Sequence, residues 1–549
     1  MNKRKWMGVG LAVSMLSAAL VGCGTKDDSN ATKENTAATN EPQEINLTIG
    51  DEVPSLDSVK GTDSISFTIL GQINEGLIRL DEKGRPVAGV AKEWKTSEDG
   101  KTYTFTLRDD AKWSDGSNVT AQDFEYAWKR GLDPATKSDY AFMLSWIEGG
   151  EAYNAGKGSV DAVAVKAKDA KTLEVKLTSP KPFFLEQLAF PTFFPQKKEF
   201  VDKSGDKFGG DVDKVLSNGP FKLSAWSHEQ SVELVKNDTY WDKANVKLTK
   251  ATFQVVKDAG ARENLYESGQ VDRALLLEDQ VDRYKDKKDE FSRRADLASG
   301  YLEYNEARPV LANVKIRQAL TYAMDGDKFT DVVYHDGSTG ATGLVPTGIS
   351  DGQGDFREHN GDLVKRADNL KKAKDLLAEG LKELNMTSLP AIKLLCSDSS
   401  SSKKGSEFIK EQWRTNLGID VQIELVPFKL RLQKQRTHDY DISLSNWGAD
   451  YNDPMTFLDL FVGDGPFNDV QYKNPKYDEL IKSAQSEPDA KKRMQSLYDA
   501  EKLLMNDMAI GPVYFSASSF ATKPYVKNWV PRVSGPDMDL KYTYIQGKK

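Results

Sequence analysis

The most constraining feature of this chain is the way its hydrophobic pattern changes period along the sequence. Three short segments place apolar residues at every second position, as half-buried strands do: 103–107, 173–177 and 421–425. Three longer segments repeat at helical spacing: 316–323, 376–384 and 494–504. Because both periods recur without a sustained internal repeat, we expect a mixed α/β fold. The roughly 500 residues that can fold correspond to about two to four domains of usual size.

Several local predictions accompany this pattern. Asp325 and Gly326 are typical of a helix end, so we expect the helix over 316–323 to stop there. The serine-rich patch 397–402 is expected to form a loop. Turn chemistry is predicted at 113–116 and 218–220, and a helix start at 120–123.

Composition and charge exclude several classes of protein. Hydrophobic residues make up 39% of the chain, which allows a sizeable core. No apolar run of about 18 residues follows residue 22, so no membrane-spanning helix is expected in the folded part. The formal charge of −8 argues against nucleic-acid binding, which needs a basic surface. The four histidines are scattered without the spacing of metal ligands, so we expect no metal ion and no cofactor.

The beginning of the chain indicates export. A basic head at 3–5 precedes an apolar stretch over 6–21 that is too short for a comfortable membrane span. The sequence Leu-Val-Gly then leads directly into Cys23, which is the pattern of a bacterial lipoprotein signal. We expect residues 1–22 to be this signal and Cys23 to carry the lipid anchor, with an ordinary signal peptide as the alternative.

The segment after this signal reads as a tether. Residues 23–44 are polar with almost no large apolar side chain, so they cannot bury a core and are expected to form a flexible leash. If Cys23 is lipidated, Cys396 has no disulfide partner, and a buried structural thiol is expected. Both features agree with attachment to the outer face of the cell membrane in a Gram-positive cell envelope.

One segment, 441–454, combines a strand with the residue types of a ligand site. Apolar residues alternate from Ile442 as in a buried strand, which then meets Trp447 and Asp450. Gly448 lets another backbone approach closely. A carboxylate at such a place can hold a cationic group, and aromatic rings can wall a side-chain pocket. The alternative is an Asx turn closed by Pro454, with Trp447 in the core.

Separate segments along the chain carry a family resemblance when taken together. They are 54–57 (PSLD), 74–77 (NEGL), 107–129 (LRDDAKWSDGSNVTAQDFEYAWK), 218–223 (NGPFKL), 237–241 (NDTYW), 313–320 (NVKIRQAL) and 447–454 (WGADYNDP). In this order, from about residue 45 to residue 544, the chain resembles the oligopeptide- and dipeptide-binding group of ABC-importer solute-binding proteins.

The resemblance implies an α/β fold of the class II periplasmic-binding-protein type, with two lobes around a cleft and an extra third domain. One lobe is expected to be discontinuous, over 45–75, 200–300 and 516–549. The extra domain is expected over 76–199 and the other lobe over 301–515. The implied function is the capture of short peptides by a monomer, closure of the lobes on the ligand, and delivery to the permease subunits of an ABC importer.

The resemblance also implies how the two ends of a peptide are treated. Asp450 is expected to hold the α-amino group of the peptide, with Trp447 beside it. The sequence departs from the best-known oligopeptide binders where they place cationic side chains for the peptide carboxylate. Leu444 and Ser402 occupy such positions here, and Arg436 is nearby but shifted by one.

Further site positions follow from the same resemblance. Backbone groups are expected to flank the peptide like added strands; they belong to Thr62, Asp63, Ser64, Asn446 and Gly448. Tyr140 and Phe428 match aromatic cleft positions, with core aromatics as the alternative, and Glu303 matches an acidic cleft position.

Other functions remain open at this point. The protein can be a receptor for a narrower range of ligands, such as a murein peptide, a signalling peptide or a dipeptide. It can also be a peptide sensor that delivers nothing to a transporter. A cell-surface enzyme acting on peptides is an alternative of another class. Segment 400–403 contains Ser-x-x-Lys, but the companion motifs Ser-Asp-Asn and Lys-Thr-Gly of cell-envelope acyl-transfer enzymes are missing. No catalytic residue is therefore expected.

Overall fold

The computed structural model describes residues 41–365, 369–532 and 534–548. The predicted signal over 1–22, Cys23 and the predicted tether up to residue 40 lie outside these residues. The last residues assigned to the tether, 41–44, are described: the Gln43 side chain donates to the Ile545 carbonyl at 2.8 Å, and Glu44 begins β1 (Glu44–Ile49). Residues 41 to 549 form one unit in terms of backbone contacts.

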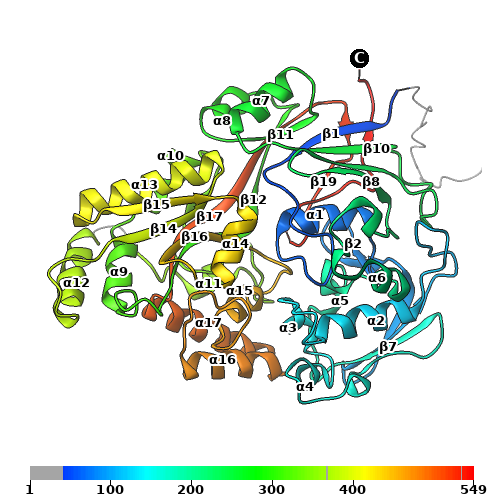
Figure 1. The fold of residues 1–549 in the computed structure, drawn as a ribbon, viewed down its shortest axis with the longest axis horizontal. Helices are drawn as coiled ribbons and strands as arrows, with labels where there is room; N and C mark the ends of the chain where they lie inside the picture. Colours follow the sequence, from blue (N-terminus) through cyan, green and yellow to red (C-terminus); the bar gives the residue numbers. More distant parts are fainter. Residues whose placement is uncertain (1–40, 366–368, 533, 549) are drawn as a thin grey trace, which may run out of the picture. The chain divides into compact units, whose positions relative to one another are not determined.

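A seven-stranded mixed sheet is built around two long strands, β12 (Phe291–Tyr304) and β17 (Ile510–Thr522). The order is β11, β17, β12, β16, β14 and β15, with β13 paired to β17 (Figure 1). β14 is parallel to both of its neighbours, whereas the other pairs are antiparallel. The shorter strands are β11 (Arg273–Leu276), β13 (Thr339–Gly340), β14 (Ile392–Ser397), β15 (Val421–Val426) and β16 (Ile442–Gly448).

Two four-stranded sheets and three two-stranded pairs complete the described strands. The first sheet has the order β1 (Glu44–Ile49), β10 (Lys250–Val255), β9 (Ser231–Lys236), β8 (Phe221–Ser227). The second has the order β4 (Ala91–Thr96), β5 (Thr102–Leu107), β7 (Thr172–Lys176), β6 (Val165–Ala167). The pairs are β2 (Ile78–Leu80) with β3 (Pro86–Ala88), β18 (Val526–Lys527) with β21 (Tyr544–Ile545), and β19 (Val530–Pro531) with β20 (Met538–Asp539).

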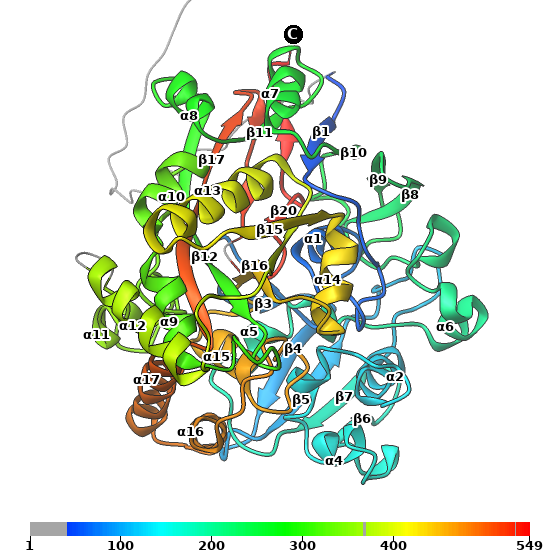
Figure 2. The ribbon, with the colours of Figure 1, turned by 60° about the vertical axis from the view of Figure 1, so that its left-hand side comes forward.

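Helices pack against these sheets. α13 (Ser400–Leu417) packs along β14 and β15, and α9 (Val314–Tyr322) packs against α12 (Leu370–Glu383) (Figures 1 and 2). The other α-helices are α1 (Ser64–Ile73), α2 (Ala121–Leu132), α3 (Ala141–Leu144), α4 (Gly150–Asn154), α5 (Phe184–Gln187), α6 (Lys198–Ser204), α7 (Ala259–Glu267), α8 (Asp279–Tyr284), α10 (Gly326–Val333), α11 (Phe356–Asn360), α14 (Phe428–Arg436), α15 (Met455–Leu458), α16 (Pro475–Ser486) and α17 (Ala490–Asp507). Short 3-10 helices are η1 (Val160–Ala162), η2 (Pro191–Phe193), η3 (Gly205–Lys207), η4 (Val212–Lys214) and η5 (Asp459–Phe461).

The mixed α/β fold and the predicted strands and helices are confirmed, and two local predictions are wrong. Asp325 does not end a helix: α9 already ends at Tyr322, and the Asp325 carboxylate accepts a hydrogen bond from the Lys328 backbone N–H at 3.0 Å as the N-cap of α10. The serine patch is not wholly a loop, because Ser399 caps α13 and the helix begins at Ser400. Serine and aspartate serve helix starts as readily as loops, and the chain uses them as starts here.

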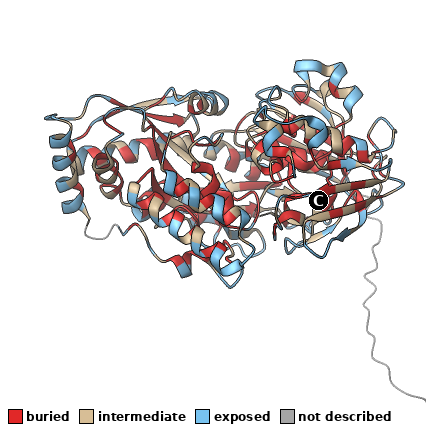
Figure 3. Cartoon of the chain, turned by 90° about the horizontal axis from the view of Figure 1, so that it is seen from below, coloured by how far each residue is buried: buried red, intermediate tan, exposed pale blue. Residues whose placement is uncertain are grey.

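The lobe boundaries stay a prediction. Two of the predicted boundaries, after residue 300 and after residue 515, fall inside β12 and β17. Both strands continue past these positions, although the register between β12 and β17 shifts between Gly300 and Tyr301. Among the described residues no helix is long and apolar enough to cross a membrane. Cys396 is completely buried on β14, and burial raises the pKa of its thiol to about 12. Buried residues lie in the interior, and many exposed residues lie on the outer faces of the helices and on loops (Figure 3).

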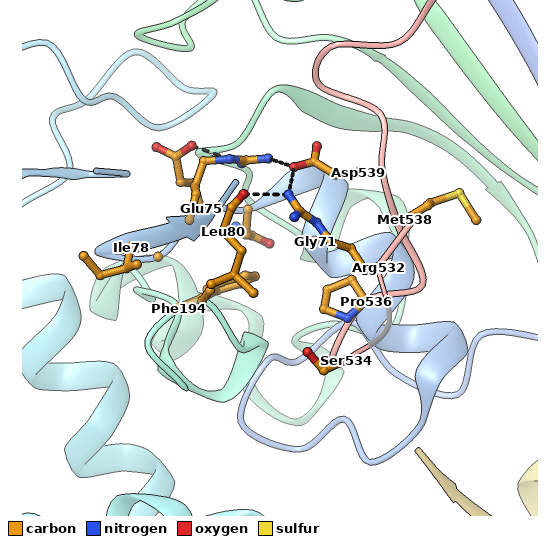
Figure 4. A pocket seen from close by; sticks show the side chains of 14 residues that line it. Gly71, Glu75, Ile78, Leu80, Phe194, Arg532, Ser534, Pro536, Met538 and Asp539 are labelled. Atoms are coloured by element: carbon orange, nitrogen blue, oxygen red, sulfur yellow. Dashed lines mark hydrogen bonds and ion pairs between the residues drawn. The ribbon is translucent and has the colours of Figure 1, made fainter. Parts of the chain in front are cut away.

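A buried ionic network ties the C-terminal segment to the region around α1 and β2 (Figure 4). Arg79 lies between Glu75 Oε2 at 3.1 Å and Asp539 Oδ2 at 2.5 Å. Asp539 also pairs with Arg532 at 2.9 Å, and Arg532 Nη2 donates to the Leu80 carbonyl at 2.7 Å. The cavity beside these groups measures about 50 Å³, so it has room for little more than water. The charged groups of the network form ion pairs with one another, so we interpret the network as structural rather than as a ligand site.

The Arg79 network predicts a specific loss of stability. Although burial alone would raise it, the charges of Arg79 and Arg532 hold the pKa of Asp539 at about 2. Arg79→Met leaves a buried carboxylate undercompensated, which we expect to cost ~3–5 kcal/mol in the free energy of unfolding at neutral pH. Because the carboxylate contributes stability only above its unfolded pKa, the penalty should shrink as the pH falls from about 4 to about 2.

Urea denaturation of wild type and variant at several pH values measures this. Lys83→Met, which removes an exposed cation from the neighbouring turn, serves as the control. Equal urea midpoints for Arg79→Met and wild type at pH 7 would contradict the structural role of the network.

Candidate functional site

One cavity of about 510 Å³ is lined by segments that are far apart in the sequence. Its wall includes the start of α1, helix α14 and parts of β11, β12, β16 and β17. The ligand-binding residues predicted from the sequence all lie in this wall: Thr62, Asp63, Ser64, Tyr140, Glu303, Phe428, Asn446, Trp447, Gly448 and Asp450. Their contacts with a ligand stay a prediction.

The end of β16 offers an unpaired backbone edge to this cavity. β16 pairs with β12 from Ile442 opposite Tyr304 to Gly448 opposite Ala298. On its other side, β14 pairs only with Ile442 and Ser443, so within the described residues the stretch 445–448 has no strand partner there. A Cβ added to Gly448 would meet no atom within 4 Å, which shows that the space beside the backbone is open. An extended ligand can therefore add to this edge as a further strand.

A second backbone segment, Thr62 to Ser64, reaches the cavity just before α1. The Asp63 carboxylate is the N-cap of α1 and accepts hydrogen bonds from the backbone N–H and the hydroxyl of Ser66, both at 2.8 Å. Burial raises the pKa of Asp63 to about 6. Because its side chain is committed to the helix, Asp63 has its backbone rather than its carboxylate to offer to a ligand.

Asp450 places a carboxyl group in the cavity wall without a cationic partner. Tyr140 Oη donates to Oδ1 at 3.1 Å and Thr456 Oγ1 donates to Oδ2 at 3.4 Å. No ion pair to Asp450 exists among the described residues, and its residue exposure is 9%. Burial raises the pKa of Asp450 to about 8, against the smaller opposing effect of the two hydroxyl donors. The group is thus ready to bind a cation, which would restore its charged form.

Aromatic rings surround this carboxyl group. Tyr140 stacks on Trp447 with a centroid distance of 6.3 Å. Phe467 packs edge-on against both rings, at 5.2 Å from Tyr140 and 4.9 Å from Trp447. The indole N–H of Trp447 is buried and has no hydrogen-bond partner in the described part of the chain. The rings keep bulk water from Asp450, and the free indole N–H is a donor available to a ligand.

A charged network occupies the part of the wall around α14. Burial, followed by the charge of Asp469, raises the pKa of Glu303 to about 7. Gln435 donates a hydrogen bond to Glu303. Arg436 pairs with Asp469 and, at 3.3 Å, with Asp139. Two carboxylates therefore compensate Arg436, so this cation is not free to hold a ligand carboxylate.

The structure adds site residues that sequence reasoning missed. Phe467 lines the cavity and stood in no recognised motif. Asp459 also stood in none; it is buried near Asp450 but is not part of the cavity wall. Both oxygens of the buried Asp459 carboxyl lack a hydrogen-bond partner among the described residues. Burial and the charges of Asp450 and Asp453 raise its pKa well above the ordinary value. Three arginines also line the cavity from separate elements: Arg262, Arg273 and Arg294.

The raised pKa of Asp450 predicts a pH-dependent stability change. The folded, ligand-free protein favours the protonated carboxyl, so this group destabilises the fold progressively as the pH rises from about 4 towards about 8. We expect Asp450→Asn to match wild type near pH 4 and to raise the melting temperature by about 2 °C or more at pH 8. Differential scanning fluorimetry measures this, with the exposed Asp464→Asn as the charge-matched control. A difference independent of pH would contradict the assignment.

Comparison with known proteins agrees with this geometry. Residues 85–469 match the bacterial extracellular solute-binding proteins, family 5. The dipeptide-binding protein DppE of Bacillus subtilis is 38% identical over 98% of this chain and 98% of its own length. The substrate-binding domain of an oligopeptide ABC transporter from Bacillus anthracis is 41% identical, with a TM-score of 0.89 over 92% of this chain and 99% of that chain. Listeria monocytogenes OppA bound to peptide is 39% identical, with a TM-score of 0.88 over 92% of this chain and 100% of that chain.

Two structures of MppA, a murein tripeptide-binding protein, match this chain with different TM-scores. Both are 30% identical and cover 92% of this chain, with 99% and 98% of those chains matched. The TM-score is 0.84 against one of them and 0.61 against the unliganded open form. The described residues therefore adopt an arrangement that differs from that open form. Together with the mixed α/β fold and the match over 85–469, these comparisons show that the chain belongs to the bacterial extracellular solute-binding proteins, family 5.

Proposed function

We propose that this protein captures short peptides on the outer face of the cell membrane and delivers them to the permease of an ABC importer. The observation that carries the proposal is the unpaired edge at 445–448, which shares one cavity with the backbone of 62–64 and with Asp450. Main-chain hydrogen bonds to such edges give affinity without reading side chains. The names of the relatives, a dipeptide-binding protein and an OppA bound to peptide, support the same ligand class.

Asp450 gives the bound peptide its direction. A peptide amino terminus is positively charged at neutral pH, and a closed cavity removes its water. Taking that charge out of water is unfavourable unless an opposite charge replaces the solvent. The carboxyl group of Asp450 supplies this charge once the ammonium group lowers its pKa, so the peptide and the ionised carboxylate stabilise one another.

The number of different peptides that the protein binds distinguishes a general peptide-binding protein from a receptor for one ligand. Main-chain recognition favours sequence-tolerant binding, whereas a dedicated receptor for a murein peptide, a signalling peptide or a dipeptide would select one ligand. Mass spectrometry of the peptides that co-purify with the protein distinguishes these cases. We propose no catalytic step, since the relatives are binding proteins of transporters; recovery of cleaved peptide after incubation with pure protein would overturn this.

The proposed amino-group anchor makes a quantitative prediction. We expect Asp450→Asn to weaken binding of a free peptide about a hundredfold or more, because the buried ammonium group loses its counter-charge. Acetylation of the peptide amino group should weaken binding to wild type by a similar factor. The two losses should not add, because both remove the same ion pair.

Isothermal titration calorimetry on the four combinations of protein and peptide measures this coupling. Asp464→Asn again controls for the loss of one negative charge at an exposed position. If wild type binds the acetylated and the free peptide equally tightly, Asp450 is not the anchor.

Membrane attachment is the second part of the proposal. The sequence Leu-Val-Gly-Cys supports cleavage before Cys23 and lipidation of its thiol, and the polar sequence 24–40, ahead of the folded part, supports a tether. We expect Cys23→Ala to abolish incorporation of a radioactive fatty acid in cells and to release the protein from the membrane fraction. Cys396→Ala, at the buried second cysteine, should keep the label. Equal labelling of wild type and Cys23→Ala would refute the assignment.

A further inference from the structure

A group of three arginines lines the cavity at the part of the seven-stranded sheet away from β14 and β15. Arg273 on β11 lies opposite Thr522 of β17, and Arg294 on β12 lies opposite Ser518 of β17. Directly paired residues and alternate residues of a strand share one face of a sheet. Arg273 and Arg294 therefore lie on the same face, together with Phe520. Helix α7 adds Arg262 to the same cavity wall.

The positive charges of this group are only partly compensated. Among the described residues neither Arg262 nor Arg273 forms an ion pair, and Arg262 Nε is buried without a partner. Arg294 Nε donates to Asp296 Oδ1 at 2.9 Å, but its buried Nη1 has no partner. Asp537 lines the cavity near Arg294, and burial raises its pKa to about 6. The charge of Asp258 acts on Arg262 without forming an ion pair with it.

Arg273 is held in a fixed position by its neighbours. Its guanidinium lies 3.6 Å from the ring centroid of Phe520 and 4.5 Å from that of Trp529, and Nη1 donates to Thr522 Oγ1 at 2.6 Å. The indole N–H of Trp529 is buried and unpartnered within the described residues. Burial, followed by the charge of Arg294, lowers the pKa of Arg273 to about 9. The cation of Arg273 is thus buried beside a second cation, and no carboxylate forms an ion pair with it among the described residues.

We infer that Arg262, Arg273 and Arg294 form a subsite for a carboxylate of the bound ligand. The inference rests on the proposed function, because a peptide brings such a carboxylate into the cavity. A guanidinium presents a planar fork of N–H donors that matches a carboxylate, and the buried Arg262 Nε, Arg294 Nη1 and Trp529 Nε1 are donors without partners. This group is separate from Leu444 and Ser402, the positions at which the sequence suggested that a carboxylate contact is missing.

Two sources can supply the carboxylate: the peptide C-terminus and an acidic side chain. Calorimetry with tri- to hexa-alanine peptides, each with a free or an amidated C-terminus, tests the first source. The same lengths with Glu or Gln at the third position test the second. The proteins are wild type, Arg294→Gln and Arg293→Gln. Arg293 is the matched control because it neighbours Arg294 on β12, is exposed and lies outside the cavity wall.

In each pair, the peptide that carries the tested carboxylate (free C-terminus or Glu) is called acidic, and its partner (amidated C-terminus or Gln) is called neutral. For one of the two pairs, we expect Arg294→Gln to weaken binding of the acidic peptide about tenfold or more and to leave binding of the neutral peptide unchanged. Arg293→Gln should change neither. If Arg294→Gln affects the free but not the amidated peptide, the subsite binds the C-terminal carboxylate. If it affects the Glu but not the Gln peptide, the subsite binds an acidic side chain. Arg294→Lys, which keeps the charge, should retain a preference for the acidic peptide, and circular dichroism checks that each variant is folded.

The outcomes separate this inference from the proposed function. If peptides bind but Arg294→Gln weakens acidic and neutral members equally, the carboxylate subsite is wrong and peptide binding stands. If no peptide binds wild type, the proposed function fails and the subsite fails with it.

Discussion

Strand β12 is the constraint on which the cavity depends, because it joins the backbone that can receive a ligand to the charges that can orient it. It pairs with β16 on one side and with β17 on the other. The close packing of the β12–β17 pair requires a residue without a side chain at Gly300, where an added Cβ would lie 1.9 Å from the ring of Tyr514. Through these two ladders one strand fixes the position of the 445–448 edge and of Arg294 in a single framework.

The electrostatic character of the cavity follows from what this framework leaves uncompensated. Among the described residues, the carboxyl group of Asp450 accepts side-chain hydrogen bonds only from neutral hydroxyl groups. In the arginine group, Arg262 Nε and Arg294 Nη1 are buried without a hydrogen-bond partner in the same part of the chain. An empty cavity that buries these groups leaves them without a full counter-charge, which is unfavourable. A ligand that carries both a cation and an anion removes both penalties at once. On the proposed function, such a ligand would stabilise the arrangement that buries it by its differential affinity for that arrangement.

The sequence predicted the parts of this site that depend on local order. The change from an apolar strand to Trp447 and Asp450 is visible within one segment, and the resemblance added cavity residues from distant segments. The arginine group was not predicted, because its members become neighbours only through the register of β11 and β12 on the intervening β17. The two wrong local predictions have a common cause, since aspartate and serine near a helix end are equally suited to begin the next helix. Asp325 and Ser399 do so here.

The unpaired stretch 445–448 also sets a requirement on the shape of whatever occupies the cavity. A strand edge accepts only a backbone that is extended and has its own N–H and C=O groups free. A segment inside a folded domain or a stable helix has already used those groups, so it cannot add to the edge without unfolding. Proline lacks the N–H group altogether and would leave a gap in the ladder wherever it faced the strand. If a ligand adds to this edge as proposed, the cavity selects by backbone availability before any side chain is read, and it favours short, unstructured chains over intact proteins.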